Sequence, residues 1–279
     1  MSLDRFVSLS IVQPFSSVRA KTQRGSILPI LMYHSISSDP EPDKANYYKV
    51  CTSPSRFYQQ LSCLQNNGYQ GVSLEKGLQL INSGEQLNAK PVVITFDDGF
   101  QDFYDHAFPV LESFGFSATM YLPTKYIGNE HKIFKGRECL SWREVQTLDR
   151  SGIEFGSHTV NHPRLVELRW SNIESELRVS KKIIEDEIGK SIISFAYPYA
   201  YPQQKKDFVG RFSEMLCESG FSTCVTTKIG ISKLGDNPLE LKRVPVNSAD
   251  DDKLLLAKLR GLYDWMGKLQ SIKKSFRNN

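Results

Sequence analysis

The chain has 279 residues, of which 40% are hydrophobic and 24% are charged, and its formal net charge is +4. This composition is typical of a globular protein of one large domain or two small ones, and the small net charge disfavours a nucleic-acid partner. The five cysteines are odd in number and form no CxxC pair, which argues against a disulfide framework and against a cysteine zinc site.

No run of residues in the sequence resembles a signal peptide or a membrane span. The partly apolar stretch at residues 6–15 is interrupted by serines, Gln13 and Pro14, lacks a basic start and is too short to cross a bilayer. We therefore favour a cytoplasmic location.

Short apolar runs alternate with amphipathic segments along the chain. The predicted strands are residues 27–33, 71–73, 91–96, 118–122, 153–155, 192–197, 223–226 and 241–246. The predicted helices are residues 54–67, 74–82, 101–114, 141–151, 171–188, 203–219 and 250–269. Strands that alternate with helices indicate parallel βα units, and hence either a doubly wound sheet or a (β/α) barrel.

Two of the predicted helices carry further signals. At the start of 171–188, Ser171 and Glu174 have the spacing of a capping box, and Gly189 is a stop signal. The helix at 250–269 is basic and has apolar residues at near-heptad spacing: Leu255, Leu259, Leu262, Met266 and Leu269. We favour its packing on the domain over the alternative, a peripheral membrane contact.

Ionisable and aromatic residues lie at or just after the ends of five of the predicted strands. They are His34, the pair Asp97 and Asp98, the pair His158 and His162, Tyr197 with Tyr199, and Arg243. Because the carboxyl ends of parallel strands gather at one face, where active sites form, we expect these residues to converge.

The motifs at these strand ends suggest a metal site. Two adjacent carboxylates repel each other unless a cation compensates them, although an aspartate that caps the next helix is an alternative interpretation. His158 and His162 form an HxxxH pair, which two unrelated surface histidines would also produce. One carboxylate and two imidazoles are a ligand set suited to Zn²⁺ or a similar divalent ion.

Three motifs in this order resemble the polysaccharide deacetylase family, that is, the NodB-homology group or carbohydrate esterase family 4. They are Thr95-Phe-Asp-Asp-Gly99, His158-Thr-Val-Asn-His162 and Phe195-Ala-Tyr-Pro-Tyr199, within a likeness that covers residues 27–247. The resemblance implies a distorted, TIM-like (β/α) barrel of seven or eight strands. It also implies a metal-dependent hydrolase that removes N-acetyl groups from an amino sugar of a polysaccharide, oligosaccharide or glycolipid.

The resemblance also implies a role for each matched residue. Asp98, His158 and His162 correspond to the metal ligands, and Asp97 corresponds to the general base that activates water. The backbone N–H of Tyr199 corresponds to the group that stabilises the oxyanion together with the metal. Zn²⁺ is the favoured ion, with Co, Ni and Fe as alternatives.

The sequence departs from the family pattern at three places. Ala196 replaces an arginine that holds the base aspartate, and Arg243 is our candidate to supply that guanidinium. Ala200 replaces a glycine, which puts a turn with positive φ in doubt. No histidine follows His162, so we assign the general acid to His34, whose Met-Tyr-His motif resembles a permuted branch of exopolysaccharide deacetylases.

The expected partner is an N-acetylated glycan. Trp142, Tyr197 and Tyr201 are candidate sugar-binding residues, residues 124–140 are a candidate substrate loop, and Ser157 and Asn161 are candidates to support the histidines. We divide the chain into an N-terminal extension (1–26), the deacetylase barrel (27–249) and a basic C-terminal helix (250–279). A metal-dependent amidase or esterase with a non-carbohydrate substrate and a catalytically impaired carbohydrate-binding member of the fold are the alternatives.

Overall fold

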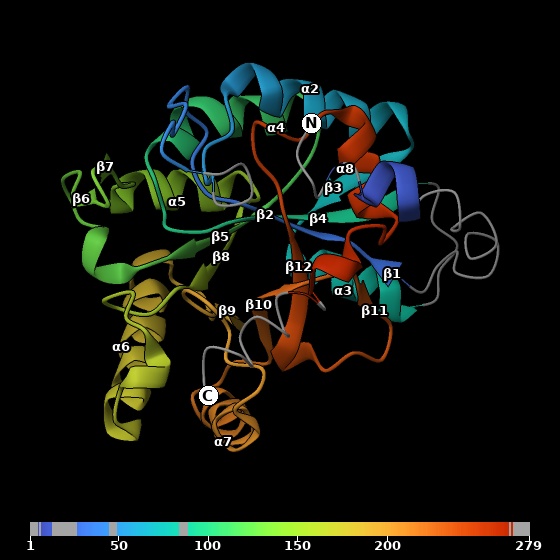
Figure 1. Ribbon diagram of the computed structural model, residues 1–279. Helices are drawn as coiled ribbons and strands as arrows, with labels where there is room; N and C mark the ends of the chain where they lie inside the picture. Colours follow the sequence, from blue (N-terminus) through green and yellow to red (C-terminus); the bar gives the residue numbers. More distant parts are fainter. Residues whose placement is uncertain are drawn as a thin grey trace.

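Seven parallel strands close into a barrel. The computed structural model describes residues 5, 7–12, 27–44, 49–83, 89–267 and 269. Around the ring, the strands follow in the order β2 (Ile30–Tyr33), β12 (Leu241–Pro245), β10 (Thr223–Ile229), β9 (Ser194–Ala196), β8 (Glu154–Ser157), β5 (Thr119–Leu122) and β4 (Lys90–Phe96). Each strand pairs with the next, and β4 pairs with β2 to close the ring. The chain therefore has the predicted (β/α) barrel, with seven strands in the ring (Figure 1).

An eighth parallel strand, β3 (Tyr69–Val72), lies outside this ring. It pairs with the amino-terminal half of β4, from Lys90 to Val93. Because β2 pairs with β4 from Val93 to Phe96 on the other edge, β3 and β5 share one edge of β4. This arrangement distorts the barrel from the regular eightfold form.

Helices surround the strands, as Figure 1 shows. They are α2 (Pro54–Asn66), α3 (Leu74–Ser83), the π-helix η4 (Phe103–Ala107) continued by α4 (Phe108–Ser113), α5 (Trp142–Arg150), α6 (Trp170–Ile188), α7 (Lys206–Glu218) and α8 (Asp252–Leu259). Two antiparallel pairs lie outside the barrel: β1 (Ile27–Leu28) with β11 (Ser232–Lys233), and β6 (Ile133–Phe134) with β7 (Arg137–Glu138). The short 3₁₀ helices are η5 (Thr124–Tyr126), η6 (Leu165–Glu167) and η7 (Pro238–Glu240).

The capping box predicted for the helix at residue 171 is wrong. α6 begins one residue earlier, at Trp170, so Ser171 lies inside the first turn, and no side chain caps the helix. Glu174 instead pairs with Arg178 one turn further on. The structure has a capping box at the start of α5, where Ser141 and Glu144 each accept a hydrogen bond from the other's backbone N–H.

The predicted continuous helix at 250–269 is also wrong, because α8 ends at Leu259 and a turn at Gly261, with φ of +76°, interrupts it. Leu255, Leu259 and Leu262 are buried, and α8 contacts α2, so these leucines pack on the domain. Residues 270–279 lie outside the described part of the chain. Within that part, every helix is too short or too polar to cross a bilayer.

Only Arg5 and the π-helix η1 (Val7–Val12) of the predicted N-terminal extension are among the described residues. They lie against the C-terminal segment. Arg5 forms an ion pair of 2.7 Å with Asp251, and the Trp265 indole donates a 3.0 Å hydrogen bond to Ser8 Oγ.

Aromatic rings pack at the carboxyl end of β4, where the acidic pair follows. Phe96 contacts the rings of Tyr33, Phe57 and Phe103, with centroids 4.7–5.8 Å apart. All four rings are fully buried. Stacked and edge-to-face contacts of this kind add to the hydrophobic contribution of burial, so they help to fix the backbone that presents Asp97.

Candidate metal and catalytic site

The strand ends bring Asp98, His158 and His162 together. Asp98 follows β4, and the two histidines lie in the turn after β8. Asp98 Oδ1 lies 3.3 Å from His162 Nε2 and 3.8 Å from His158 Nε2. Over the described residues, this buried trio is the one group found whose ligand atoms all lie within 4.8 Å of one another.

Hydrogen bonding orients His158 as a ligand requires. Its Nδ1 donates a 2.7 Å hydrogen bond to the carbonyl of Ala196, which leaves the Nε2 lone pair directed toward Asp98. Burial lowers the pKa of His158 to about 3, so the imidazole is neutral at physiological pH. A fixed tautomer and a neutral ring are the usual state of a metal-bound histidine, so the trio fits a divalent ion.

Glu176, on α6, holds the turn that carries both histidines. Its carboxylate accepts hydrogen bonds from the backbone N–H of Val160 and of Asn161, at 2.8 and 2.9 Å, and from the Asn161 side chain at 2.6 Å. Ser157 Oγ accepts a bond from the N–H of Thr159, whose own hydroxyl accepts one from His162 N–H. Ser157 and Asn161 therefore contact the histidine turn, as the sequence suggested.

Arg243 and Asp97 form a buried bidentate ion pair. Arg243 Nη1 and Nη2 each lie 2.7 Å from one carboxylate oxygen of Asp97. Arg243 also donates to Thr95 Oγ1 and to the carbonyl of Thr226. Burial opposes ionisation of Asp97, but the adjacent guanidinium outweighs it and lowers the pKa to about 2. The guanidinium missing at Ala196 is thus supplied from β12.

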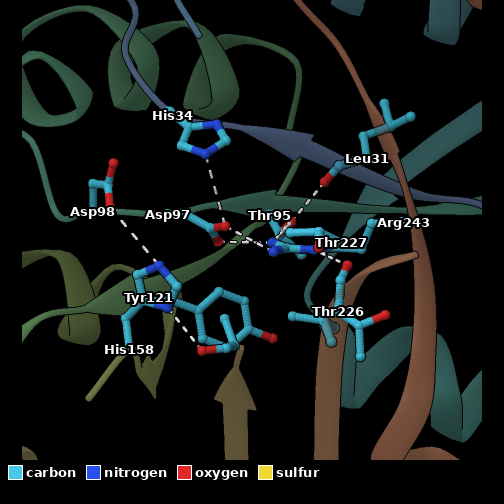
Figure 2. Close-up of polar contacts among 12 residues, drawn as sticks. Leu31, His34, Thr95, Asp97, Asp98, Tyr121, His158, Thr226, Thr227 and Arg243 are labelled. Carbon is cyan, nitrogen blue, oxygen red and sulfur yellow. Dashed lines mark hydrogen bonds and ion pairs between the residues drawn. The ribbon is translucent and has the colours of Figure 1, made fainter. Parts of the chain in front are cut away.

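His34, after β2, approaches Asp97 from another side, as Figure 2 shows. Its Nε2 lies 4.0 Å from Asp97 Oδ2, and its side chain is partly exposed to solvent. Burial lowers the pKa of His34, although the neighbouring Asp97 and Asp98 oppose that shift. A partly exposed imidazole therefore lies beside the carboxylate pair.

The Tyr199 backbone is held in a left-handed conformation, with φ of +57°. Thr227 fixes this turn, because its hydroxyl donates to the Tyr199 carbonyl and accepts from the Tyr201 N–H. The Tyr199 N–H donates to no other residue in the described part of the chain. Ala200 does not have a positive φ, so the turn does not need the family's glycine there.

Backbone strain is concentrated around this site. Of the six non-glycine residues with positive φ in the described ranges, all but Glu41 contact the site: Asp98, Lys135, Thr159, His162 and Tyr199. Such conformations cost free energy and persist only where the surrounding contacts enforce them. For Thr159 and His162 these contacts include the hydrogen bonds that Glu176 and Ser157 accept from their turn, and for Tyr199 they include the bond that Thr227 donates.

The structure contradicts the predicted sugar-stacking residues. Tyr197 and Tyr201 are 1% and 0% exposed, and their rings pack against each other in the core. Trp142 is also buried, at the first position of α5. An aromatic side chain near a strand end can point into the core or toward solvent. The sequence does not show which of the two directions it takes.

Sequence reasoning missed Lys135, which lies in the predicted substrate loop 124–140. Its Nζ is 3.0 and 3.2 Å from the two carboxylate oxygens of Asp98. Lys135 occupies the turn between β6 and β7, with φ of +51°. The only signal in the sequence was the following glycine, Gly136, which marks a turn but does not say where the lysine points.

Comparisons with known proteins identify the family to which this barrel belongs. A model of the family "Polysaccharide deacetylase" matches residues 84–211. YxkH of Bacillus subtilis (strain 168), which is assigned as a polysaccharide deacetylase, is 30% identical over 236 residues, covering 83% of this chain and 76% of YxkH. The chain therefore belongs to the polysaccharide deacetylase family.

Two further relatives are similar to parts of the chain. The solved structure of Streptococcus pyogenes deacetylase PplD in complex with acetate superposes with a TM-score of 0.70 at 27% identity, over 84% of this chain and 98% of PplD. The poly-beta-1,6-N-acetyl-D-glucosamine N-deacetylase of Escherichia coli (strain K12) is 30% identical over 140 residues, which are 47% of this chain and 20% of that protein.

Proposed function

We propose that this protein is a Zn²⁺-dependent hydrolase that removes N-acetyl groups from an amino sugar of a glycan. Asp98, His158 and His162 hold the ion, which supplies Lewis-acid polarisation of the amide carbonyl when bound. The family membership and the named activities of PplD and the Escherichia coli relative support deacetylation.

The protein's own residues supply the proton transfers. Asp97, kept ionised by Arg243, takes a proton from the attacking water. The free Tyr199 N–H donates to the carbonyl oxygen as negative charge develops there. His34 protonates the departing nitrogen, because an amine anion is too poor a leaving group to depart unprotonated.

The observation that carries this proposal is that the adjacent Asp97 and Asp98 have different partners. Asp98 contacts the two histidines, whereas Asp97 is bound by Arg243 in a fully buried ion pair. One carboxylate thus serves as a ligand and the other as a base. The same ion pair is evidence against the alternative of a catalytically impaired protein, because Arg243 compensates for the family's arginine that Ala196 replaces.

The test measures two quantities for each variant: the Zn²⁺ content of the purified protein and its release of acetate from N-acetylglucosamine oligomers. Asp98→Ala should lose both bound Zn²⁺ and activity, whereas Asp97→Asn should keep Zn²⁺ and lose turnover. Full activity of Asp97→Asn would refute the assigned base. Acetate release from small acyl amides or esters but from none of the acetylated sugars would favour the non-carbohydrate amidase or esterase.

A further inference from the structure

An exposed aromatic ring beside the metal ligands lies close to two cationic side chains. The Tyr199 side chain is 43% exposed, and its ring contacts His162 edge-on, with centroids 4.6 Å apart. Arg164 Cζ lies 5.1 Å from the Tyr199 ring centroid, and Lys135 Nζ lies 5.6 Å from it. A flat ring suits the apolar face of a sugar, and the cations suit an anionic group on that sugar.

The charges around this ring are not balanced within the protein. Asp97 is matched by Arg243, and Asp98 by Lys135. Arg164 is exposed and has no carboxylate within 4.0 Å among the residues that the structure describes. A guanidinium with five donors therefore lies at the mouth of the site without an anionic partner.

A bound divalent ion would add to this excess of positive charge. The ion and the Lys135 ammonium are both attracted to the two Asp98 oxygens, so they compete for them. Lys135 lies on a two-residue turn and its side chain is 41% exposed, so it can turn toward solvent. Two cations, Arg164 and Lys135, would then be available to a ligand that sits on Tyr199.

We propose that Tyr199, Arg164 and Lys135 form a subsite for an anionic sugar residue next to the N-acetyl group that is cleaved. The substrate class is then an acidic glycan. The anionic group is a carboxylate, as in a uronic acid, or a phosphate ester. This inference rests on the proposed deacetylase function, since it concerns the substrate of the same site.

The test compares the binding of matched neutral and acidic oligosaccharides. The first probe alternates N-acetylglucosamine with glucuronic acid, and its partner is the same oligosaccharide with each carboxyl reduced to an alcohol. A second pair is an N-acetylglucosamine oligomer with and without a phosphate ester. Dissociation constants are measured on the full-length, Zn²⁺-loaded Asp97→Asn variant, so that turnover does not interfere.

Arg164→Gln, made in the same background, removes the unmatched guanidinium. Arg150→Gln is the matched control, because Arg150 is exposed at the end of α5 that precedes β8, at the opposite end of the barrel. At least one acidic probe should bind about tenfold more tightly than its neutral partner, the effect of one charged hydrogen bond. Arg164→Gln should remove most of that preference and Arg150→Gln should keep it.

The pair with the larger preference identifies the anion as carboxylate or phosphate. Equal binding within both pairs would overturn the subsite, and so would a preference that Arg150→Gln and Arg164→Gln reduce equally, since that would reflect net charge alone. Acetate release by the unsubstituted protein is measured on all four probes. If none of the four probes releases acetate, the deacetylase function is refuted. If the acidic and neutral members of each pair bind equally and release acetate equally, only the acidic subsite is refuted.

Discussion

Arg243 and Asp97 contact each other through two parallel hydrogen bonds of 2.7 Å. β12, which carries Arg243, and β4, which precedes Asp97, both pair with β2. The two residues are therefore neighbours in space although 146 positions separate them in the sequence. The contact keeps Asp97, the proposed base, ionised and fixes the plane of its carboxylate.

Replacing Arg243 should raise the pKa of Asp97. Arg243→Lys keeps the charge but loses the bidentate geometry, so the acidic limb of the pH profile of kcat/KM should move to higher pH. Arg243→Met leaves a buried carboxylate without a partner and should reduce the free energy of unfolding by about 3–5 kcal/mol.

The pH dependence of that stability follows from the pKa. Asp97 titrates at about 2 in the folded chain, below its ordinary value of 3.8, so the pair stabilises the fold above pH 3.8 and this contribution is lost as the pH falls toward 2. The unfolding free energies of the unsubstituted protein and of Arg243→Met should therefore differ most above pH 3.8 and converge in acid. A constant difference at all pH values would contradict the ion-pair explanation.

Glu176→Ala should weaken Zn²⁺ binding by about tenfold to a hundredfold, because the turn with His158 and His162 loses the carboxylate that holds its backbone. Glu176→Gln keeps one acceptor oxygen and should weaken binding less. The affinity is measured by competition with a chelator. Glu174→Ala is the control, since Glu174 lies on the same helix but, among the described residues, its side chain pairs with Arg178 alone. Equal affinities of Glu176→Ala and Glu174→Ala would exclude this positioning role.

Lys135→Met should strengthen Zn²⁺ binding severalfold, because the ammonium that competes for the Asp98 oxygens is removed. The gain should shrink as salt is added, since Lys135 is partly exposed. Lys132→Met is a matched control, because the Lys132 ammonium bonds the carbonyls of Lys125 and Ile127 and no carboxylate in the part of the chain that the structure describes. Weaker binding by Lys135→Met than by Lys132→Met would show that Lys135 supports the metal site.

His34→Ala should reduce the hydrolysis of an N-acetyl amide by about a hundredfold or more, because its nitrogen needs a proton to leave. The hydrolysis of an aryl acetate should fall much less, since a phenolate leaves without one. Zn²⁺ content, measured on the same samples, should be unchanged. Equal losses on both substrates would remove His34 from the role of general acid.

Much of the fold followed from local patterns. Alternating apolar and amphipathic segments predicted the parallel strands, because burial of a central strand on both faces requires a continuous apolar run such as residues 92–94. Element ends were less predictable. Ser171 and Glu174 have the spacing of a capping box, but the helix starts at Trp170, since packing of the helix overrides so small a local preference.

The sequence by itself determined the alternation of parallel strands with helices and the order of the acidic and histidine motifs, because periodicity and motif spacing are local properties of the chain. The alternation left a doubly wound sheet and a barrel open, and the resemblance of the motifs to the deacetylase family implied the barrel. Only the tertiary structure decided that Arg243 binds Asp97, that Lys135 turns onto Asp98, and that Tyr197 and Tyr201 face the core while Tyr199 faces solvent. These outcomes depend on barrel closure and on left-handed residues such as Asp98, Lys135 and Tyr199, which set side-chain directions that no local pattern encodes.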